Sequence, residues 1–113
     1  MRLRALVFLA LLAAAAPFKL HLGARARRHI LSEHFPGGGR TAGKSVFNAG
    51  EDLDALIALA ADAKPRRERN GRDKRVADAG RAIGADGRSG KPVRTVVVIA
   101  EPDGEVVTAY PGR

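Results

Sequence analysis

The pattern of apolar and polar positions predicts helices in the first half of the chain and strands in the second. Residues 24–34 (ARARRHILSEH) are good helix formers, and the Phe-Pro-Gly sequence at 35–37 predicts a firm stop. Residues 51–63 (EDLDALIALAADA) predict the clearest helix, because their apolar positions recur at helical spacing behind an acidic first turn. These apolar positions are Leu53, Leu56, Ile57 and Ala60. Residues 65–74 are charged and resemble a loop.

After this loop the chain breaks into short segments separated by glycine. Residues 93–100 (VRTVVVIA) predict a strand, since their β-branched run is short and bounded by prolines. A Pro-Asp-Gly turn at 102–104 and residues 105–110 predict the returning strand, and residues 76–83 predict one or two weaker strands. We therefore expect one α+β domain with N-terminal helices followed by a small antiparallel β-sheet, and not an alternating parallel fold.

The first 17 residues differ from the rest of the chain. Arg2 and Arg4 precede an apolar run at 5–12 and small residues at 13–16, a layout typical of a secretory signal. The apolar run is shorter than the ~20 residues of a membrane-spanning helix, so we expect no stable membrane span. A membrane anchor and a structural helix remain alternatives. Residues 1–17 are thus predicted to direct secretion or export, and residues 18–113 to form a single domain.

The positive charge of the chain indicates which class of partner it binds. The formal net charge is +8, and residues 1–17 contribute only two arginines to it, which leaves +6 on the predicted domain. An excess of positive charge favours polyanions, among which nucleic acid is the commonest partner. The chain contains no cysteine, which excludes disulfides and cysteine-based zinc sites.

A glycine-rich segment at 38–45 matches the phosphate-binding pattern G-x-x-x-x-G-K-[ST] at every fixed position. A nucleotide-binding loop of this type leaves a buried strand and opens directly into a helix. Here a helix stop precedes the segment and five residues separate it from the next helix, so the context argues against a nucleotide hydrolase. Arg40 and Lys44 on this loop remain candidates for holding a phosphodiester, with a solvated turn as the alternative.

Cleavage of RNA without a metal needs a base for the ribose 2′-hydroxyl, an acid for the leaving 5′-oxygen and cations for the phosphorane. Histidine suits the first two roles, and the chain has three of them. His21 adjoins the predicted signal and is expected to be incidental. His29 and His34 are roughly 140° apart around a regular helix. An unbroken helix is therefore not expected to direct both into one small pocket, so either His34 lies beyond its end or only one is catalytic.

The order of motifs resembles the bacterial EndoU-type ribonuclease domains, which act as toxins in competition between bacteria. Similar toxins belong to the wider barnase-, EndoU-, colicin- and RelE-like grouping, in which helices precede a small antiparallel sheet. The resemblance spans His29 to Pro111 and rests on order and spacing more than on any single motif. The motifs are RHIL at 28–31, GGG at 37–39, GKSVF at 43–47, the acidic-led helix and TAYP at 108–111.

The resemblance implies a role for each matching position. It makes His29 catalytic, and it places Lys44 and Ser45 beside the phosphate. It makes Thr108 and Tyr110 contact the substrate from one face of the last strand; ordinary sheet positions are the alternative for these two. Gly39, in the glycine cluster, is expected at the substrate as well.

One position departs from the family pattern. The family has a second histidine directly after the glycine cluster, where this chain has Arg40. An arginine stays protonated and is a poor general acid or base, although it stabilises negative charge. Three explanations remain open: His34 supplies the missing proton transfer, the chain belongs to a sister family with an H-x-x-x-x-H start, or its activity is reduced.

These observations lead to one expected function and one alternative. The expected function is a metal-independent, cofactor-free endoribonuclease toxin that leaves a 2′,3′-cyclic phosphate and a 5′-hydroxyl. His29, His34, Arg40, Lys44, Thr108 and Tyr110 form its expected active site. It would act on RNA, including tRNA, in the cytoplasm of a target cell, and an acidic immunity protein would protect the producer. The alternative is a non-catalytic RNA- or polyanion-binding module.

Overall fold

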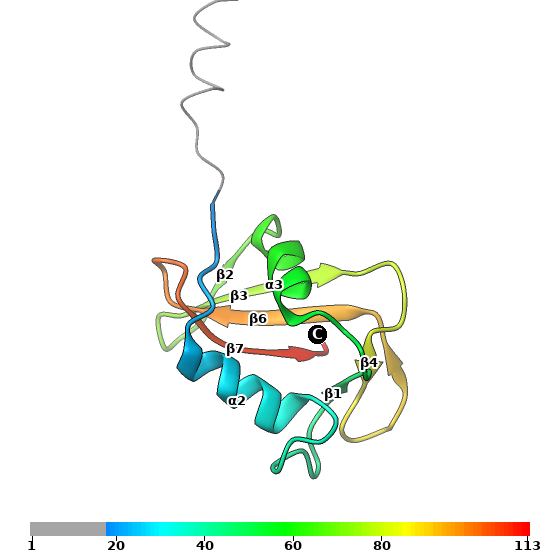
Figure 1. The fold of residues 1–113 in the computed structure, drawn as a ribbon. Helices are drawn as coiled ribbons and strands as arrows, with labels where there is room; N and C mark the ends of the chain where they lie inside the picture. The colour runs from blue at the N-terminus through cyan, green and yellow to red at the C-terminus, as the bar shows by residue number, and fades with distance from the viewer. Residues whose placement is uncertain (1–17) are drawn as a thin grey trace, which may run out of the picture.

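A computed structural model describes residues 18–113 as two helices and seven strands (Figure 1). The predicted signal at 1–17 lies outside the described residues. The elements are α2 (Ala24–His34), β1 (Val46–Phe47), α3 (Leu53–Ala61), β2 (Arg66–Arg67), β3 (Asp73–Asp78), β4 (Gly84–Ala85), β5 (Pro92–Val93), β6 (Thr95–Ala100) and β7 (Val106–Pro111). The predicted α+β class is confirmed. The helices do not strictly precede the strands, because the short β1 lies between α2 and α3.

The main sheet is antiparallel, with the strand order β2-β3-β6-β7. The central strand β6 pairs with β3 on one side and β7 on the other, with Val98 opposite both Arg75 and Ala109. The short strands β1, β4 and β5 form a second antiparallel sheet. The prediction of antiparallel strands is therefore correct, but the strands form two separate sheets instead of one.

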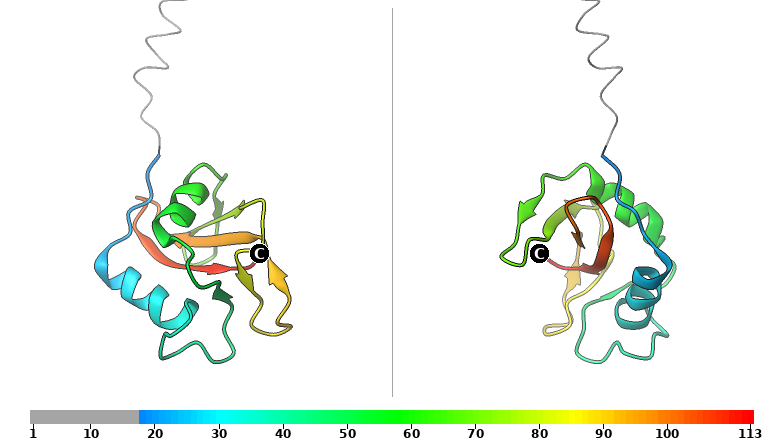
Figure 2. Two further views of the ribbon diagram at one scale, coloured as in Figure 1. Left: turned by 45° about the vertical axis from the view of Figure 1, so that its right-hand side comes forward. Right: turned by 90° about the vertical axis from the view of Figure 1, so that its left-hand side faces the viewer.

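Both helices pack on the same face of the main sheet, as the turned views in Figure 2 show. The core beneath them joins Ile30 of α2, Leu56 and Ile57 of α3, and Val96 and Val98 of β6. Side chains alternate along a strand, so residues paired with Val97 point to the opposite face. Tyr110 is the β7 partner of Val97, which places it away from the core.

Local chemistry explains where α3 begins. Asp52 accepts a hydrogen bond from the Ala55 amide at 3.2 Å and so acts as the N-terminal cap. Glu51 lies before the cap and pairs with Arg81 at 2.6 Å. The predicted helix at 51–63 was therefore two residues too long at each end, since the helix itself spans Leu53–Ala61.

The charged segment at 65–74 was wrongly expected to be a loop throughout. It contains β2 and the start of β3, which pair as a hairpin with Arg67 opposite Asp73. The turn spans Glu68 to Gly71, where the Gly71 amide donates to the Glu68 carbonyl at 3.0 Å, and Gly71 adopts a φ of 85° that other residues rarely tolerate. The Asn-Gly pair was the sequence signal for this hairpin.

The described N-terminal residues are tied to the sheet. His21 forms a bridge with Glu105, in which the His21 amide donates to Gly104 and its carbonyl accepts from Val106, both at 2.8 Å. Within residues 18–113, neither helix has the length and apolar character needed to cross a membrane.

Candidate functional site

His29 lies at the centre of a chain of hydrogen bonds between α2 and β7. Glu33, one helical turn later, approaches His29 Nδ1 with Oε2 at 2.8 Å. On the other side of the ring, His29 Nε2 lies 3.0 Å from Thr108 Oγ1. The two contacts fix the orientation of a side chain that is 40% exposed, so the ring is held in place while still open to a ligand.

The state of Glu33 determines which ring nitrogen carries the proton. Lys44 forms an ion pair with Glu33, and this hydrogen bond is the main reason that the pKa of Glu33 lies below its ordinary value. An ionised carboxylate only accepts hydrogen bonds. His29 Nδ1–H therefore donates to Glu33, and in the neutral ring Nε2 is left to accept from Thr108.

His34 places a second imidazole beside the first. Its ring centre is 6.0 Å from that of His29 and 5.7 Å from that of Tyr110. The Ser45 carbonyl lies 2.8 Å from His34 Nδ1, so Nδ1–H donates there and leaves Nε2 available. Burial is the main cause that lowers the pKa of His34, which keeps this ring neutral at pH 7.

The expectation that an unbroken helix separates the two histidines was wrong. His34 is the last residue of α2, not beyond its end, and its ring still meets that of His29. The Cβ atoms of His29 and His34 point in different directions from the helix. The two rings still meet, because the Ser45 carbonyl of the following loop holds the His34 ring against Tyr110 and towards His29.

Thr108 and Tyr110 point to the same side of β7, opposite to the core residue Ala109. They pair with Ile99 and Val97 of β6, as the period-two alternation predicted. Because β7 is the edge strand, the Thr108 hydroxyl and the Tyr110 ring meet His29 and His34 of α2 beside the sheet. Burial raises the pKa of Tyr110, so its hydroxyl keeps its proton.

The glycine loop contributes unequally to this site. Lys44 reaches Glu33, and the Ser45 hydroxyl accepts a hydrogen bond from the Gly87 amide at 2.9 Å. The Arg40 amide donates to the Ser32 carbonyl at 3.0 Å, but its side chain is exposed and forms no hydrogen bond or ion pair with residues 18–113. Gly39 is also exposed, with open space where a side chain would begin. The loop runs into β1 and not into a helix, which agrees with the argument against a nucleotide-binding loop.

A pocket of about 670 Å³ opens beside His29 and Thr108. Arg25 from the first turn of α2 and Arg72 from the loop before β3 line it, and Arg72 pairs with Glu101 at 3.0 Å. Sequence reasoning missed both arginines and Glu33. The four-residue spacing from His29 was a usable signal for Glu33, whereas only the fold brings Arg25 and Arg72 together.

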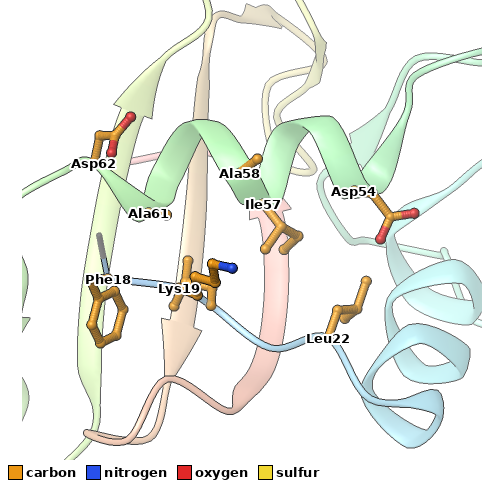
Figure 3. A pocket seen from close by; sticks show the side chains of 9 residues that line it. Phe18, Lys19, Leu22, Asp54, Ile57, Ala58, Ala61 and Asp62 are labelled. Carbon is orange, nitrogen blue, oxygen red and sulfur yellow. The ribbon is translucent and has the colours of Figure 1, made fainter. Parts of the chain in front are cut away.

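A second pocket of about 370 Å³ lies between α3 and the N-terminal segment at 18–22 (Figure 3). Its lining is largely aliphatic, with Ile57 pointing from α3 towards the N-terminal segment, and Asp54 and Asp62 stand at its two ends. None of the predicted site residues lines it. The chemistry-bearing side chains thus gather at the α2–β7 junction and not at this apolar pocket.

Comparisons with known proteins add no assignment: the chain matches no family profile, and no curated protein matches its sequence. The candidate site therefore rests on geometry. His29, His34, Lys44, Ser45, Thr108 and Tyr110 converge, whereas Gly39 and the side chain of Arg40 are exposed and make no contact with the cluster through hydrogen bonds or ion pairs among residues 18–113.

Proposed function

We propose that residues 18–113 form a metal-independent endoribonuclease domain. The observation that carries the proposal is the pair of imidazoles with ring centres 6.0 Å apart, one of them held between Glu33 and Thr108. Two histidines with fixed tautomers are the groups that transesterification of RNA requires. Within residues 18–113 Nε2 of His34 has no hydrogen-bond partner, and Nε2 of His29 contacts the Thr108 hydroxyl, which a substrate oxygen would displace. The closeness of His29 and Thr108 also allows them to share a single nucleotide.

The surroundings of the two rings suggest a division of labour. His34, neutral because burial lowers its pKa, takes the proton from the ribose 2′-hydroxyl on Nε2. The 2′-oxygen then attacks phosphorus and the bond to the 5′-oxygen breaks. His29, in its protonated form, gives its Nε2 proton to that leaving oxygen, while Glu33 keeps the ring oriented. The products are a 2′,3′-cyclic phosphate and a 5′-hydroxyl.

Cations near the rings would stabilise the phosphorane and hold the strand. Lys44 lies in the cluster and can exchange Glu33 for a phosphate oxygen, and Arg40 stands on the adjoining exposed loop. The pocket beside His29 would receive a flanking nucleotide at Arg25, since Arg72 is paired with Glu101 and Glu105 also lines the pocket. The net charge supports a polyanionic substrate.

The proposal extends to biological context. Residues 1–17 would direct export, and the domain would act as a toxin on RNA, including tRNA, in the cytoplasm of a target cell. An acidic immunity protein that covers the basic site would protect the producer. The layout of residues 1–17 supports export, the resemblance to EndoU-type domains supports the toxin role, and the positive charge of the domain supports an acidic partner.

The test is cleavage of end-labelled RNA by the purified full chain in the presence of EDTA. We expect fragments that end in a 2′,3′-cyclic phosphate, and we expect His29→Ala and His34→Ala to abolish them. His21→Ala is the matched control, because the hydrogen bonds of His21 involve its backbone. If RNA stays intact but binds with a salt-sensitive affinity that His29→Ala leaves unchanged, the domain is a binding module instead.

A further inference from the structure

Three side chains at the end of α2 form a compact set of metal-binding groups. His29, Glu33 and His34 each offer one ligand atom, and these atoms all lie within 4.8 Å of one another. The closest pair, His29 Nδ1 and Glu33 Oε2, is 2.8 Å apart. Ligand atoms around a tetrahedral zinc ion are about 3.4 Å apart, so small side-chain rotations would bring all three into range.

The second ring nitrogen of His34 is already oriented as in a metal site. A metal-bound histidine usually donates its other N–H to a carbonyl or carboxylate, which fixes the ring and its tautomer. His34 Nδ1 makes this contact with the Ser45 carbonyl at 2.8 Å, and its Nε2 is left for an ion. Two imidazoles and one carboxylate suit zinc and similar transition metals better than magnesium or calcium.

We propose that His29, Glu33 and His34 bind a divalent transition-metal ion such as Zn²⁺, and that the ion inhibits the domain. The binding is independent of the proposed function, whereas the inhibition rests on it. An ion on Nε2 of His34 takes the lone pair that the proposed cleavage uses as its base. An ion on Nδ1 of His29 displaces the Nδ1 proton, so this ring no longer forms the imidazolium that gives its Nε2 proton to the leaving oxygen. The proposed cleavage itself requires no metal. A fourth position would remain for water.

Lys44 distinguishes this site from a simple cluster of polar groups. Its ammonium group pairs with Glu33 and places a positive charge beside the ligand atoms. Lys44 contacts Oε1 of Glu33, whereas His29 contacts Oε2, so an ion would share the carboxylate with the ammonium group or displace it. Replacing Lys44 with methionine removes the competing positive charge, so Lys44→Met should bind zinc more tightly than the wild-type chain does.

The experiment is calorimetric titration of the full chain with Zn²⁺, with Mg²⁺ as the comparison ion and the visible spectrum of Co²⁺ as a second probe. We expect one zinc per chain, no heat with Mg²⁺, and a tetrahedral Co²⁺ spectrum. Glu33→Gln and His34→Gln should weaken binding roughly 10- to 100-fold, and Lys44→Met should strengthen it. His21→Ala is the control, and circular dichroism verifies the fold of each variant.

The outcomes separate the two proposals. Absence of zinc binding, or equal affinity in wild-type, Glu33→Gln and Lys44→Met chains, overturns the metal site whatever the chain does to RNA. Zinc that binds through these residues and stops RNA cleavage until EDTA is added supports both binding and inhibition. Cleavage that zinc accelerates overturns inhibition. Zinc binding by a chain that never cleaves RNA retains the site and refutes the ribonuclease.

Discussion

The α2–β7 junction and the glycine loop both carry polar residues, but they hold them differently. At the junction, His29, Glu33 and Thr108 are linked side chain to side chain at 2.8 and 3.0 Å. In the loop, backbone bonds fix the path of the chain, such as the one from the Arg40 amide to Ser32, while the Arg40 side chain stays exposed. A fixed ring is ready for proton transfer, whereas an exposed guanidinium contributes mainly charge.

The largest expected difference between the two regions is in catalysis. His29→Ala should slow RNA cleavage about 100- to 10,000-fold, because it removes a positioned proton donor. Arg40→Ala should slow it less than about tenfold, since an exposed charge is screened by solvent. Single-turnover rates on one labelled RNA measure both. Equal losses would mean that the Arg40 side chain belongs to the catalytic centre.

Within the loop itself, two neighbouring glycines test whether the backbone or the side chains matter. A Cβ at Gly38 would meet the carbonyl oxygens of Leu31 and Ser32 at the end of α2, whereas one at Gly39 would meet nothing within 4 Å. Gly38→Ala should therefore lower the free energy of unfolding by about 1–3 kcal/mol, and Gly39→Ala by less than about 0.5 kcal/mol. Urea denaturation of the two variants gives the comparison. A larger effect at Gly39 would contradict the packing described for this loop.

The hydroxyl of Thr108 should have a smaller effect. Thr108→Val keeps the shape of the side chain but loses the hydrogen bond to His29 Nε2, and a bond of this kind contributes about 0.5–1.5 kcal/mol. We expect the cleavage rate to fall about two- to tenfold, and Thr108→Ser to restore it. A valine variant as fast as the wild-type chain, or a serine variant as slow as the valine variant, would show that the hydroxyl alone is not what β7 supplies.

The smallest expected effect is on stability against pH. Burial holds the pKa of His34 below its ordinary value of 6.5, so the unfolded chain binds a proton more readily than the folded one. The contribution of the neutral His34 ring to folding stability is therefore fully present above pH 6.5, and it is lost as the pH falls through the pKa of the folded state. The titratable groups around this ring remain in a His34→Gln variant; they are His29, Glu33, Lys44 and Tyr110.

Urea denaturation in EDTA at about pH 7.5 and pH 5 measures the effect. The free energy of unfolding should decrease less on acidification in His34→Gln than in the wild-type chain. The same decrease in both chains would assign the pH dependence to another group. A larger decrease in the variant would reverse the sign that burial of the ring requires.

The sequence was a good guide where local signals decide the structure. The helix at 24–34 begins and ends as predicted, because helix formers precede a proline-glycine stop. The strands β6 and β7 fall within or next to the predicted ranges, since a β-branched run is followed by a Pro-Asp-Gly turn. Both depend on neighbours in the chain, which the sequence shows directly.

Contacts between distant segments were less predictable. The meeting of His29 with Thr108 spans 79 positions, and the resemblance suggested it before the geometry placed the two groups 3.0 Å apart. The His34 ring lies close to the His29 ring because the Ser45 carbonyl holds it there, and residue type does not reveal the position of a backbone carbonyl. Arg25 and Arg72 meet at one pocket only because β3 and β7 flank β6.

The central position of β6 makes this strand the most protected part of the main sheet. Val96, Val97 and Val98 are fully buried and their strand is paired on both sides, so its amide protons should be among the slowest to exchange with heavy water. Thr108 and Tyr110 are attached to this slowly exchanging part through β7. His29 and His34 belong to α2, which no backbone ladder joins to the main sheet within residues 18–113. Transient release of α2 would therefore separate the two halves of the site while the sheet stays intact.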